Sequence, residues 1–464
     1  MLRVLRQYFP IRNILFLLLE GCVIFSCILL STVLLTFSDS YWFDLFLIFR
    51  ITLITIICQI CLYYNDLYDF DVVSTVPEIS IRLLQALGVT SITLAGIYYI
   101  FPLVILDQKI YILSIFFLMV FIVFWRIGYI HMLNRGMFNE RIIILGSSSL
   151  AMDIYDKVDG TIDCGYTISA IIPDTEDDVS MIEIPDELIM SRGEKKLAEL
   201  SKTREIDKIV VALKEKRGGF PTKELIQCRT AGIDILEGSS FYEMLTGKVL
   251  VQKINPSWLI FSRGFHKSKT KAFLKRIEDI VLSSLMLITL SPLLIIVSIL
   301  IKIDSKGPVL FSQDRVGMHK KEYMMHKFRS MVVDAEKLTG PVWAGDNDQR
   351  VTRVGRFIRK YRIDELPQLW EVLTGKMSLV GPRPERKHFT DQLEEQIPYY
   401  DQRFNVKPGL TGWAQVSYDY GATIEDAVEK LNYELFYIKN MSLAMDVVII
   451  LKTVKTVLFG RGAR

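Results

Sequence analysis

Long apolar stretches in the first third of the chain constrain its fold most. A helix needs roughly 20 apolar residues to cross about 30 Å of hydrocarbon, and four stretches reach that length. Charge is sparse there, since 17 of the first 140 residues are charged against 90 of the other 324. We therefore predict a four-helix transmembrane bundle over residues 1–136, joined to water-exposed domains. The predicted spans are Ile14–Thr36, Leu45–Tyr64, Leu83–Leu106 and Ile110–Ile130.

The composition excludes several classes of protein. Half of the 464 residues are hydrophobic, which is the opposite of the composition of a disordered chain. Six cysteines are too few for a small domain held by disulfides. A net charge of +3 gives no reason to expect a nucleic-acid partner, and we predict none.

Positive charge flanks both ends of the four-span region. Lysine and arginine accumulate on the cytoplasmic side of a membrane, and an even number of spans returns the chain to the side where it began. Both ends of the region are therefore expected in the cytoplasm. The flanking residues are Arg3, Arg6 and Arg12 before the first span, and Arg126, Arg135 and Arg141 at and after the fourth.

A second pattern begins at Arg141, where short apolar strands alternate with helices. Such alternation predicts a parallel α/β sheet, and we assign a Rossmann-like domain to residues 137–250 and a linker to 251–274. The expected strands are Arg141–Leu145, Tyr166–Ile172, Asp207–Leu213 and Ile233–Leu236, and the expected helices are Ser147–Val158 and Lys223–Ala231.

The middle domain lacks the fingerprint of a dinucleotide site. That fingerprint needs three glycines around the first turn and an acidic residue after the second strand. Here Gly146 is followed by three serines, and the acidic residue would be Asp174, separated from the strand by Pro173. We therefore expect the fold without a bound nucleotide.

A fifth apolar run, Ile280–Ile303, differs from the first four. Lysines flank both of its ends, and Ser291-Pro292 lies at its midpoint. Proline kinks a helix, and a serine hydroxyl can satisfy the carbonyl that proline leaves free. We expect a helix that enters one leaflet and returns to the same face, with a kinked full span as the alternative. Lys275 and Arg276 can pair with Asp279 at its entrance.

The last third of the chain is rich in groups that bind phosphate. Arg353, Arg356 and Arg359 recur every three residues, so they share one side of a helix. Arginine forks match phosphate oxygens. Asp364 and Glu365 follow at the start of a short helix. Adjacent carboxylates can hold Mg²⁺ together with substrate phosphates, or one of them can attack phosphorus as a nucleophile.

The last 190 residues contain a series of motifs, which are Lys275-Arg276, Asp279, Ser291-Pro292, Lys327–Met331, Asp364–Leu369, Gly381–Glu385 and Lys407–Trp413. On these motifs, the last 190 residues resemble the bacterial sugar transferase family, the monotopic phosphoglycosyl transferases. The whole architecture is similar to the large subgroup, which implies a regulatory role for the Rossmann-like domain. Pro341–Arg356 and Tyr437–Arg464 further resemble the exosortase-associated exopolysaccharide transferases.

The resemblance implies a mainly helical α/β catalytic domain over 275–464, with a re-entrant helix at about 277–303. It implies that Asp364 attacks a nucleoside diphosphate sugar, most simply a UDP-sugar, and releases the nucleoside monophosphate. Polyprenyl (undecaprenyl) phosphate then takes the sugar phosphate from the aspartate. By the same resemblance, Glu365 and Asp364 hold Mg²⁺, and phosphates are bound by Lys327, Arg329 and Arg383, to which the arginine series adds Arg353 and Arg356.

The same resemblance places the site at the cytoplasmic face of the bacterial inner membrane, next to lipid. It also implies that the protein forms a homodimer. Ser442–Phe459 is predicted as a helix, either interfacial or in the core, and sugar specificity is expected in Leu338–Gln349. Two alternatives stay open. One is a membrane-anchored nucleotide-sugar dehydratase that uses NAD in the middle domain. The other is a non-enzymatic scaffold that binds lipid or nucleotide, against which the intact Asp364-Glu365 pair argues.

Overall fold

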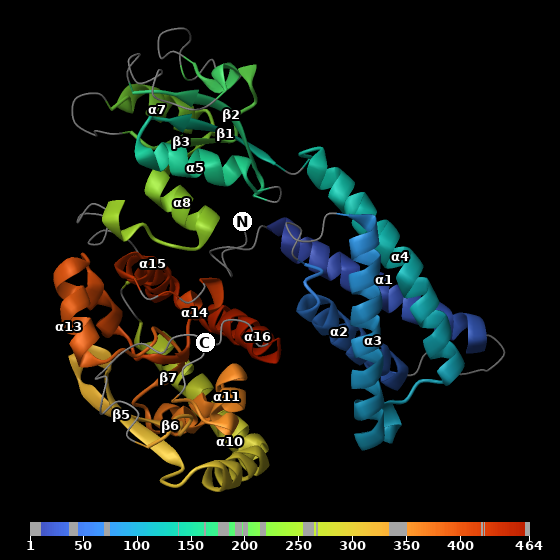
Figure 1. The fold of residues 1–464 in the computed structure, drawn as a ribbon. Coiled ribbons are helices and arrows are strands. Elements are labelled where there is room, and N and C mark those ends of the chain that lie inside the picture. The colour runs from blue at the N-terminus through green and yellow to red at the C-terminus, as the bar shows by residue number, and fades with distance from the viewer. Residues whose placement is uncertain are drawn as a thin grey trace. The chain divides into compact units, whose positions relative to one another are not determined.

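The computed structural model divides the chain into two compact units, Met1–Phe241 and Tyr242–Arg464. The fold is mostly helical, with several apolar helices at the N-terminus and a small parallel sheet (Figure 1). This architecture fits a multi-domain membrane protein. The structure describes residues 11–36, 45–68, 75–137, 139–161, 164–174, 185–190, 197, 203–213, 220–253, 264–265, 268–333, 350–418, 421 and 423–459.

Four apolar helices open the first unit, and each is long enough to cross a membrane. α1 packs along α4 and α2 packs along α3, around a shared core of isoleucine and leucine side chains. The helices are α1 (Ile11–Thr36), α2 (Leu45–Tyr64), α3 (Val76–Ile100) and α4 (Gln108–Asn134).

The third predicted span is wrong at both ends. α3 runs from Val76 to Ile100, where Leu83–Leu106 was expected. A proline lies in its first turn, where a missing N–H costs nothing. Pro102 follows its end and disfavours helical geometry at Phe101. The apolar residues after Ile100 therefore continue the hydrophobic pattern without continuing the helix.

A buried ion pair joins α1 to α4. Arg126 Nη2 lies 2.7 Å from Glu20 Oε1, and the two side chains are 1% and 0% exposed. Arg126 also donates to the backbone oxygen of Leu67, and its guanidinium lies 5.5 Å from the ring of Phe16 and 5.3 Å from that of Tyr68. The sequence pattern suggested only a flanking positive charge at Arg126, whereas the structure places that charge inside the helix packing.

A four-stranded parallel sheet follows in the order β2-β1-β3-β4, which confirms the predicted parallel α/β arrangement. Gly146, directly after β1, has a φ of +127°, and a Cβ there would lie 2.2 Å from the Ala212 oxygen, so only glycine fits this turn. The elements are β1 (Glu140–Leu145), α5 (Ser149–Asp159), β2 (Tyr166–Ile172), β3 (Lys208–Val211), α7 (Thr222–Thr230), β4 (Asp234–Glu237) and α8 (Gly238–Thr246).

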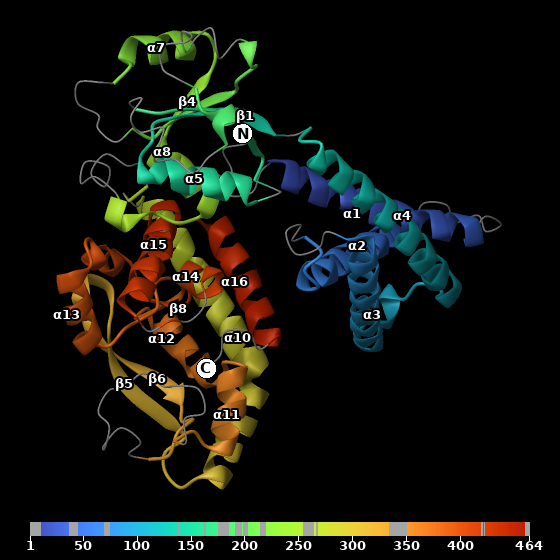
Figure 2. The ribbon, with the colours of Figure 1, turned by 45° about the horizontal axis from the view of Figure 1, so that its top comes forward.

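The second unit is built on the long helix α10 (Lys269–Asp304) and a β-hairpin, with shorter elements packed between them (Figure 2). The hairpin strands are β5 (Leu310–Val316) and β6 (Glu322–Phe328), and β7 (Ser378–Val380) pairs in parallel with β8 (Gly409–Thr411). The helices are α11 (Arg353–Lys360), α12 (Leu369–Thr374), α13 (Lys387–Gln396), α14 (Trp413–Ser417), α15 (Ile424–Asn440) and α16 (Leu443–Leu458), with 3₁₀ turns η7 (Ile363–Gln368) and η8 (Tyr400–Asn405).

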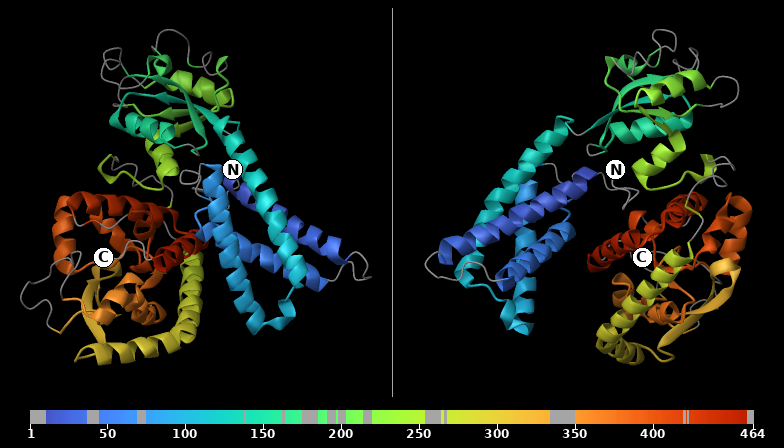
Figure 3. Two further views of the ribbon diagram at one scale, coloured as in Figure 1. Left: turned by 45° about the vertical axis from the view of Figure 1, so that its right-hand side comes forward. Right: turned by 180° about the vertical axis from the view of Figure 1, so that it is seen from behind.

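Helix α10 bends along its course, as Figure 3 shows in its left-hand view. Pro292 lies inside the helix and cannot donate to the Ile288 carbonyl four residues earlier. Ser291 Oγ donates to that same oxygen at 2.8 Å. The predicted break is therefore a bend within one continuous helix, and the serine compensates the hydrogen bond that proline removes.

The buried pair in the first unit predicts a large stability effect. Arg126→Leu would leave the Glu20 carboxylate buried without its cation, and we expect the free energy of unfolding to fall by about 3–5 kcal/mol. Denaturant unfolding of the purified protein in detergent measures this. The double variant Glu20→Leu/Arg126→Leu removes both charges and should recover most of the loss. A double variant as unstable as the single one would contradict this account.

Candidate active site

Asp364 and Glu365 lie next to each other in η7, between α11 and α12. Arg362 precedes them with a left-handed backbone (φ 51°), which turns the chain out of α11 and into η7. Both carboxyl groups are buried. η7 packs against strand β6, so the pair faces residues of the β-hairpin.

Glu365 is held between cations from separate parts of the second unit. Its Oε1 accepts hydrogen bonds from Lys327 Nζ at 2.7 Å and from Arg383 Nη2 at 2.8 Å, and Arg362 Nη1 lies 3.9 Å from its Oε2. Burial alone would raise the pKa of Glu365. Arg383, Lys327 and Arg362 outweigh burial and hold that pKa well below its usual range. Glu365 is therefore a fixed, ionised carboxylate.

Asp364 has a different environment from its neighbour. Burial, reinforced by the charge of Glu365, raises the pKa of Asp364 to about 6, against the opposing effect of Lys327, Arg359 and Arg383. No hydrogen bond or ion pair to its side chain is found among the described residues. The two adjacent carboxyls thus have pKa values shifted in opposite directions, a property of paired catalytic carboxyls.

The two carboxyls fit a site for Mg²⁺. This ion is usually bound by one or two carboxylates together with substrate phosphates and water, without a complete protein cage. Asp364 has no close cation contact among the described residues, and the Oε2 of Glu365 has only the long ion pair with Arg362 at 3.9 Å. Among the residues that the structure describes, no cluster of three or more His, Cys, Asp or Glu side chains is placed to bind a metal ion.

The structure brings three predicted site residues, Glu365, Lys327 and Arg383, together next to Asp364. Lys327 comes from β6 and Arg383 from the segment after β7, and both contact Glu365. Arg359, on α11, lies close enough to lower the pKa of Asp364, while Arg353 and Arg356 are exposed on the same helix. The phosphate-binding role of these arginines stays a prediction.

Arg329 lies elsewhere, at the end of α10. Its Nη1 donates to the Lys306 oxygen at 2.9 Å, and its Nη2 donates to the backbone oxygen and the hydroxyl of Ser305 at 2.8 and 2.9 Å. The side chain is buried. Its hydrogen bonds therefore close the C-terminal end of α10, which gives Arg329 a structural use that the motif Lys327–Met331 did not suggest.

The first half of α10 is fastened to the site elements, but not through the predicted pairs with Asp279. Lys275 Nζ pairs with Asp446 Oδ2 of α16 at 2.7 Å. Arg276 donates to the oxygens of Val372 and Leu373 at 2.7 Å each, which caps the end of α12. The buried carboxylate of Asp279 instead accepts from two groups of β7, Ser378 Oγ at 3.0 Å and Leu379 N at 2.9 Å.

Sequence reasoning missed several buried groups around the site. Arg403 pairs with Glu434, 31 residues away in the chain, and Tyr437 donates to Asp446 at 2.8 Å and to the Val380 oxygen at 3.1 Å. No local spacing marks these pairs. The predicted specificity loop Leu338–Gln349 lies outside the described residues.

Comparison with known proteins locates the similarity mainly in the second unit. The model of the family described as "Bacterial sugar transferase" matches residues 270–460. The UDP-N-acetylgalactosamine-undecaprenyl-phosphate N-acetylgalactosaminephosphotransferase of Aeromonas hydrophila is 44% identical over 240 residues, 52% of this chain and 56% of that protein. The undecaprenyl-phosphate glucose phosphotransferase of Komagataeibacter xylinus is 43% identical over 194 residues, 41% of this chain and 36% of that protein.

A third relative aligns over more of the chain. The undecaprenyl-phosphate galactose phosphotransferase of Salmonella typhimurium is 31% identical over 367 residues, 75% of this chain and 74% of that protein. The similarity therefore extends well beyond the second unit in this case. The chain spans about half, or less, of the length of the first two relatives.

The position of Arg329 leads to a prediction that separates its structural use from phosphate binding. Arg329→Met removes a charged donor from Ser305 and Lys306, and each such bond contributes about 1.5–3 kcal/mol. We expect a clear fall in the thermal unfolding temperature of the purified protein. The matched control Arg353→Met changes an exposed arginine of α11 and should leave the unfolding temperature unchanged. Unchanged unfolding of Arg329→Met, with an increase in the KM for the phosphate-bearing substrate, would favour phosphate binding instead.

Proposed function

Because the chain belongs to the bacterial sugar transferase family, we propose that it is a phosphoglycosyl transferase. It transfers a sugar 1-phosphate from a UDP-sugar to undecaprenyl phosphate, giving undecaprenyl-diphosphate-sugar and UMP. The names of three relatives include undecaprenyl phosphate, which we take as the acceptor. One of these names also includes a UDP-sugar, which we take as the donor. The product would start the assembly of an exopolysaccharide or another glycoconjugate.

The observation that carries this proposal is the contrast between two adjacent carboxyls. Glu365 is occupied by Lys327 and Arg383, whereas Asp364 next to it keeps both oxygens open. A carboxylate that is buried and poorly stabilised is a better nucleophile than one paired with cations, because it loses less interaction energy on reaction. We therefore assign the attack on phosphorus to Asp364.

The reaction proceeds in two displacements. An oxygen of Asp364 attacks the phosphorus that bears the sugar, and the bond from that phosphorus to the oxygen of the nucleoside phosphate breaks, with UMP as the leaving group. The sugar phosphate is then an acyl-phosphate on Asp364. An oxygen of undecaprenyl phosphate attacks the same phosphorus and breaks its bond to Asp364. The aspartate is regenerated, and no oxidant or external proton donor is needed.

The cations of the site stabilise charge during both steps. Lys327 and Arg383 already converge on Glu365, so two cations lie beside the position where phosphoryl charge would develop. Asp364 and Glu365 would hold Mg²⁺, which supplies neutralisation of the diphosphate charge when it is bound. Arg359, on α11, adds positive charge near Asp364.

The acceptor is a lipid, so the site must lie at a membrane surface. α10 exposes most of its apolar length, with Asp279, Ser283, Val297 and Ile301 as its buried residues. We propose that its two arms enter and leave the cytoplasmic leaflet of the inner membrane from the same side. The bend at Pro292 and the basic residues at both ends support this topology.

The middle domain is assigned a regulatory role without bound nucleotide. Asp174 Oδ2 accepts from the backbone N and from the hydroxyl of Ser147, each at 3.1 Å. This carboxylate lies at the first strand-to-helix turn, where a dinucleotide fold binds pyrophosphate. A negative group already bound at the turn disfavours the dehydratase alternative. NAD-dependent thermal stabilisation of the protein would revive that alternative.

Substitution of the two carboxyls tests the proposed chemistry. Asp364→Asn removes the nucleophile, so UMP release from every member of a UDP-sugar panel should fall to background in purified membranes. Glu365→Gln keeps the shape but loses the charge that holds Lys327 and Arg383, and we expect a loss of roughly 100- to 1,000-fold in kcat. The control is Lys387→Gln, which changes an exposed residue of the same unit and should leave UMP release unchanged. Full UMP release by Asp364→Asn would disprove the nucleophile assignment.

Substitution of the proline tests the proposed topology. Pro292→Ala restores a backbone donor to Ile288 and allows α10 to straighten into a full span. In right-side-out membrane vesicles, we expect added protease to leave the wild-type second unit intact and to cleave a fraction of the variant. Ser291→Ala leaves the proline in place and is the matched control. Cleavage of the wild-type second unit from the outer side would show that α10 crosses the membrane.

A further inference from the structure

The segment Gly381–Glu385 places Arg383 next to Glu365 and belongs to no helix or strand. It connects β7 to α13 and contains Pro382 and Pro384, which have no N–H to donate. Of its other N–H groups, that of Gly381 donates to the Thr411 oxygen at 2.9 Å and that of Arg383 donates to Glu434, and the remaining backbone hydrogen bonds are made through carbonyl groups. What binds those carbonyls therefore decides where the guanidinium of Arg383 lies.

Four consecutive carbonyls of this segment each accept a hydrogen bond from outside it. Two of the donors are backbone groups and two are arginine side chains, and the arginine donors bind the residues at and directly after Arg383. The contacts are Gly409 N to Pro382 O at 2.8 Å, Arg403 Nη2 to Arg383 O at 2.8 Å, Arg315 Nη1 to Pro384 O at 3.1 Å, and Val316 N to Glu385 O at 3.0 Å.

Arg403 is a rigid donor because its charge is satisfied in the protein interior. Its Nε and Nη2 donate to the two oxygens of Glu434 at 3.0 and 2.9 Å, and its Nη1 donates to Tyr400 OH at 2.5 Å. Arg403 and Glu434 have side-chain exposures of 5% and 6%. A forked pair of this kind fixes the guanidinium plane, so the remaining hydrogen of Nη2 is aimed at the Arg383 oxygen.

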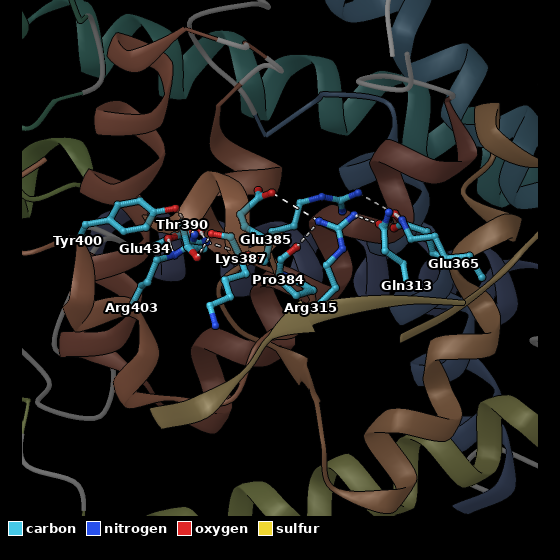
Figure 4. Close-up of polar contacts among 12 residues, drawn as sticks. Gln313, Arg315, Glu365, Pro384, Glu385, Lys387, Thr390, Tyr400, Arg403 and Glu434 are labelled. Atoms are coloured by element: carbon cyan, nitrogen blue, oxygen red, sulfur yellow. Dashed lines mark hydrogen bonds and ion pairs between the residues drawn. The ribbon is translucent and has the colours of Figure 1, made fainter. Parts of the chain in front are cut away.

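Arg315 approaches the same segment from strand β5. Its Nη2 donates to Gln313 Oε1 at 2.7 Å, and its Nη1 lies 3.6 Å from Glu385 Oε2. Figure 4 shows Arg315 beside Pro384 and Glu385, with the Arg403–Glu434–Tyr400 group to one side and Glu365 to the other. Arg315 is partly buried and Arg403 is buried, and the two arginines hold neighbouring peptide groups from two different elements, β5 and η8.

We propose that Arg315 and Arg403 are positioning residues of the transfer reaction, which fix the segment Gly381–Glu385 so that the guanidinium of Arg383 meets Glu365. This inference rests on the proposed function. Neither arginine contacts Asp364 or Glu365 in the described structure; both act through Arg383. A displacement of about 1 Å in a catalytic group can cost roughly 100-fold in rate, so a small shift of this segment suffices to impair the reaction.

Lysine substitutions test the proposal, because lysine keeps the charge and loses the fork. Arg403→Lys can still pair with Glu434 but cannot also bind the Arg383 oxygen in the same geometry. We expect the rate of UMP release in a single turnover with donor alone to fall roughly 10- to 100-fold, with little change in the KM for the donor. Arg315→Lys should give the same pattern if Arg403→Lys proves too unstable to purify.

A double-variant cycle separates positioning from a general loss of stability. If Arg403 acts through Arg383, then Arg403→Lys should cause almost no further loss of rate in an Arg383→Lys background. Equal losses in the two backgrounds would overturn the proposal. So would a fall in unfolding temperature without a change in rate.

A control variant removes another buried ion pair of the same unit. Lys439 pairs with Glu243 at 2.6 Å, with side chains 10% and 4% exposed, and touches no residue of Gly381–Glu385 in the described contacts. Lys439→Met should lower the unfolding temperature and leave the UMP release rate unchanged. If the wild-type protein releases no UMP from any donor, the proposed function itself is wrong. If the wild-type enzyme is active but the effects of Arg403→Lys and Arg383→Lys simply add, only the positioning role is wrong.

Discussion

The site depends on one carboxylate oxygen, Glu365 Oε1, which accepts hydrogen bonds from two cations that are distant in the sequence. Lys327 reaches it from the β-hairpin and Arg383 from the segment after β7. Burying a carboxylate is costly unless it has charged partners, and the partly exposed Lys327 and Arg383 are the partners of buried Glu365. The contact therefore joins the hairpin, η7 and the Gly381–Glu385 segment at a single point and leaves Asp364, one residue away, without such partners.

The proposed lipid-facing helix is joined to the same elements by equally specific contacts. Asp279 accepts from β7, which leads directly to Arg383, and Arg276 caps α12, which follows directly from η7. Two successive turns of α10 thus contact the elements before Arg383 and after Glu365. A displacement of α10 would therefore be transmitted to both sides of the Glu365 contact.

Local patterns in the sequence were sufficient for some elements and insufficient for others. Strand β2 has the predicted bounds, because Tyr166–Ile172 is an apolar run between turn residues. The end of α3 was mispredicted because hydrophobicity continues past Ile100, while Pro102 ends the helix. Asp364, Glu365, Lys327 and Arg383 were found through motifs, but Arg126 and Arg403 have acidic partners far away in the sequence, and no spacing rule connects them.

The bend in α10 has a consequence for how such an enzyme can be assembled. Ser291 satisfies the carbonyl that Pro292 leaves open, so the bend exposes no unpaired backbone oxygen to hydrocarbon at that point. In the proposed topology, the second unit then carries its own means of reaching a lipid substrate. Catalysis and membrane attachment would be inherited together as one module, and the four N-terminal helices and the middle domain would be free to diverge without loss of access to the acceptor.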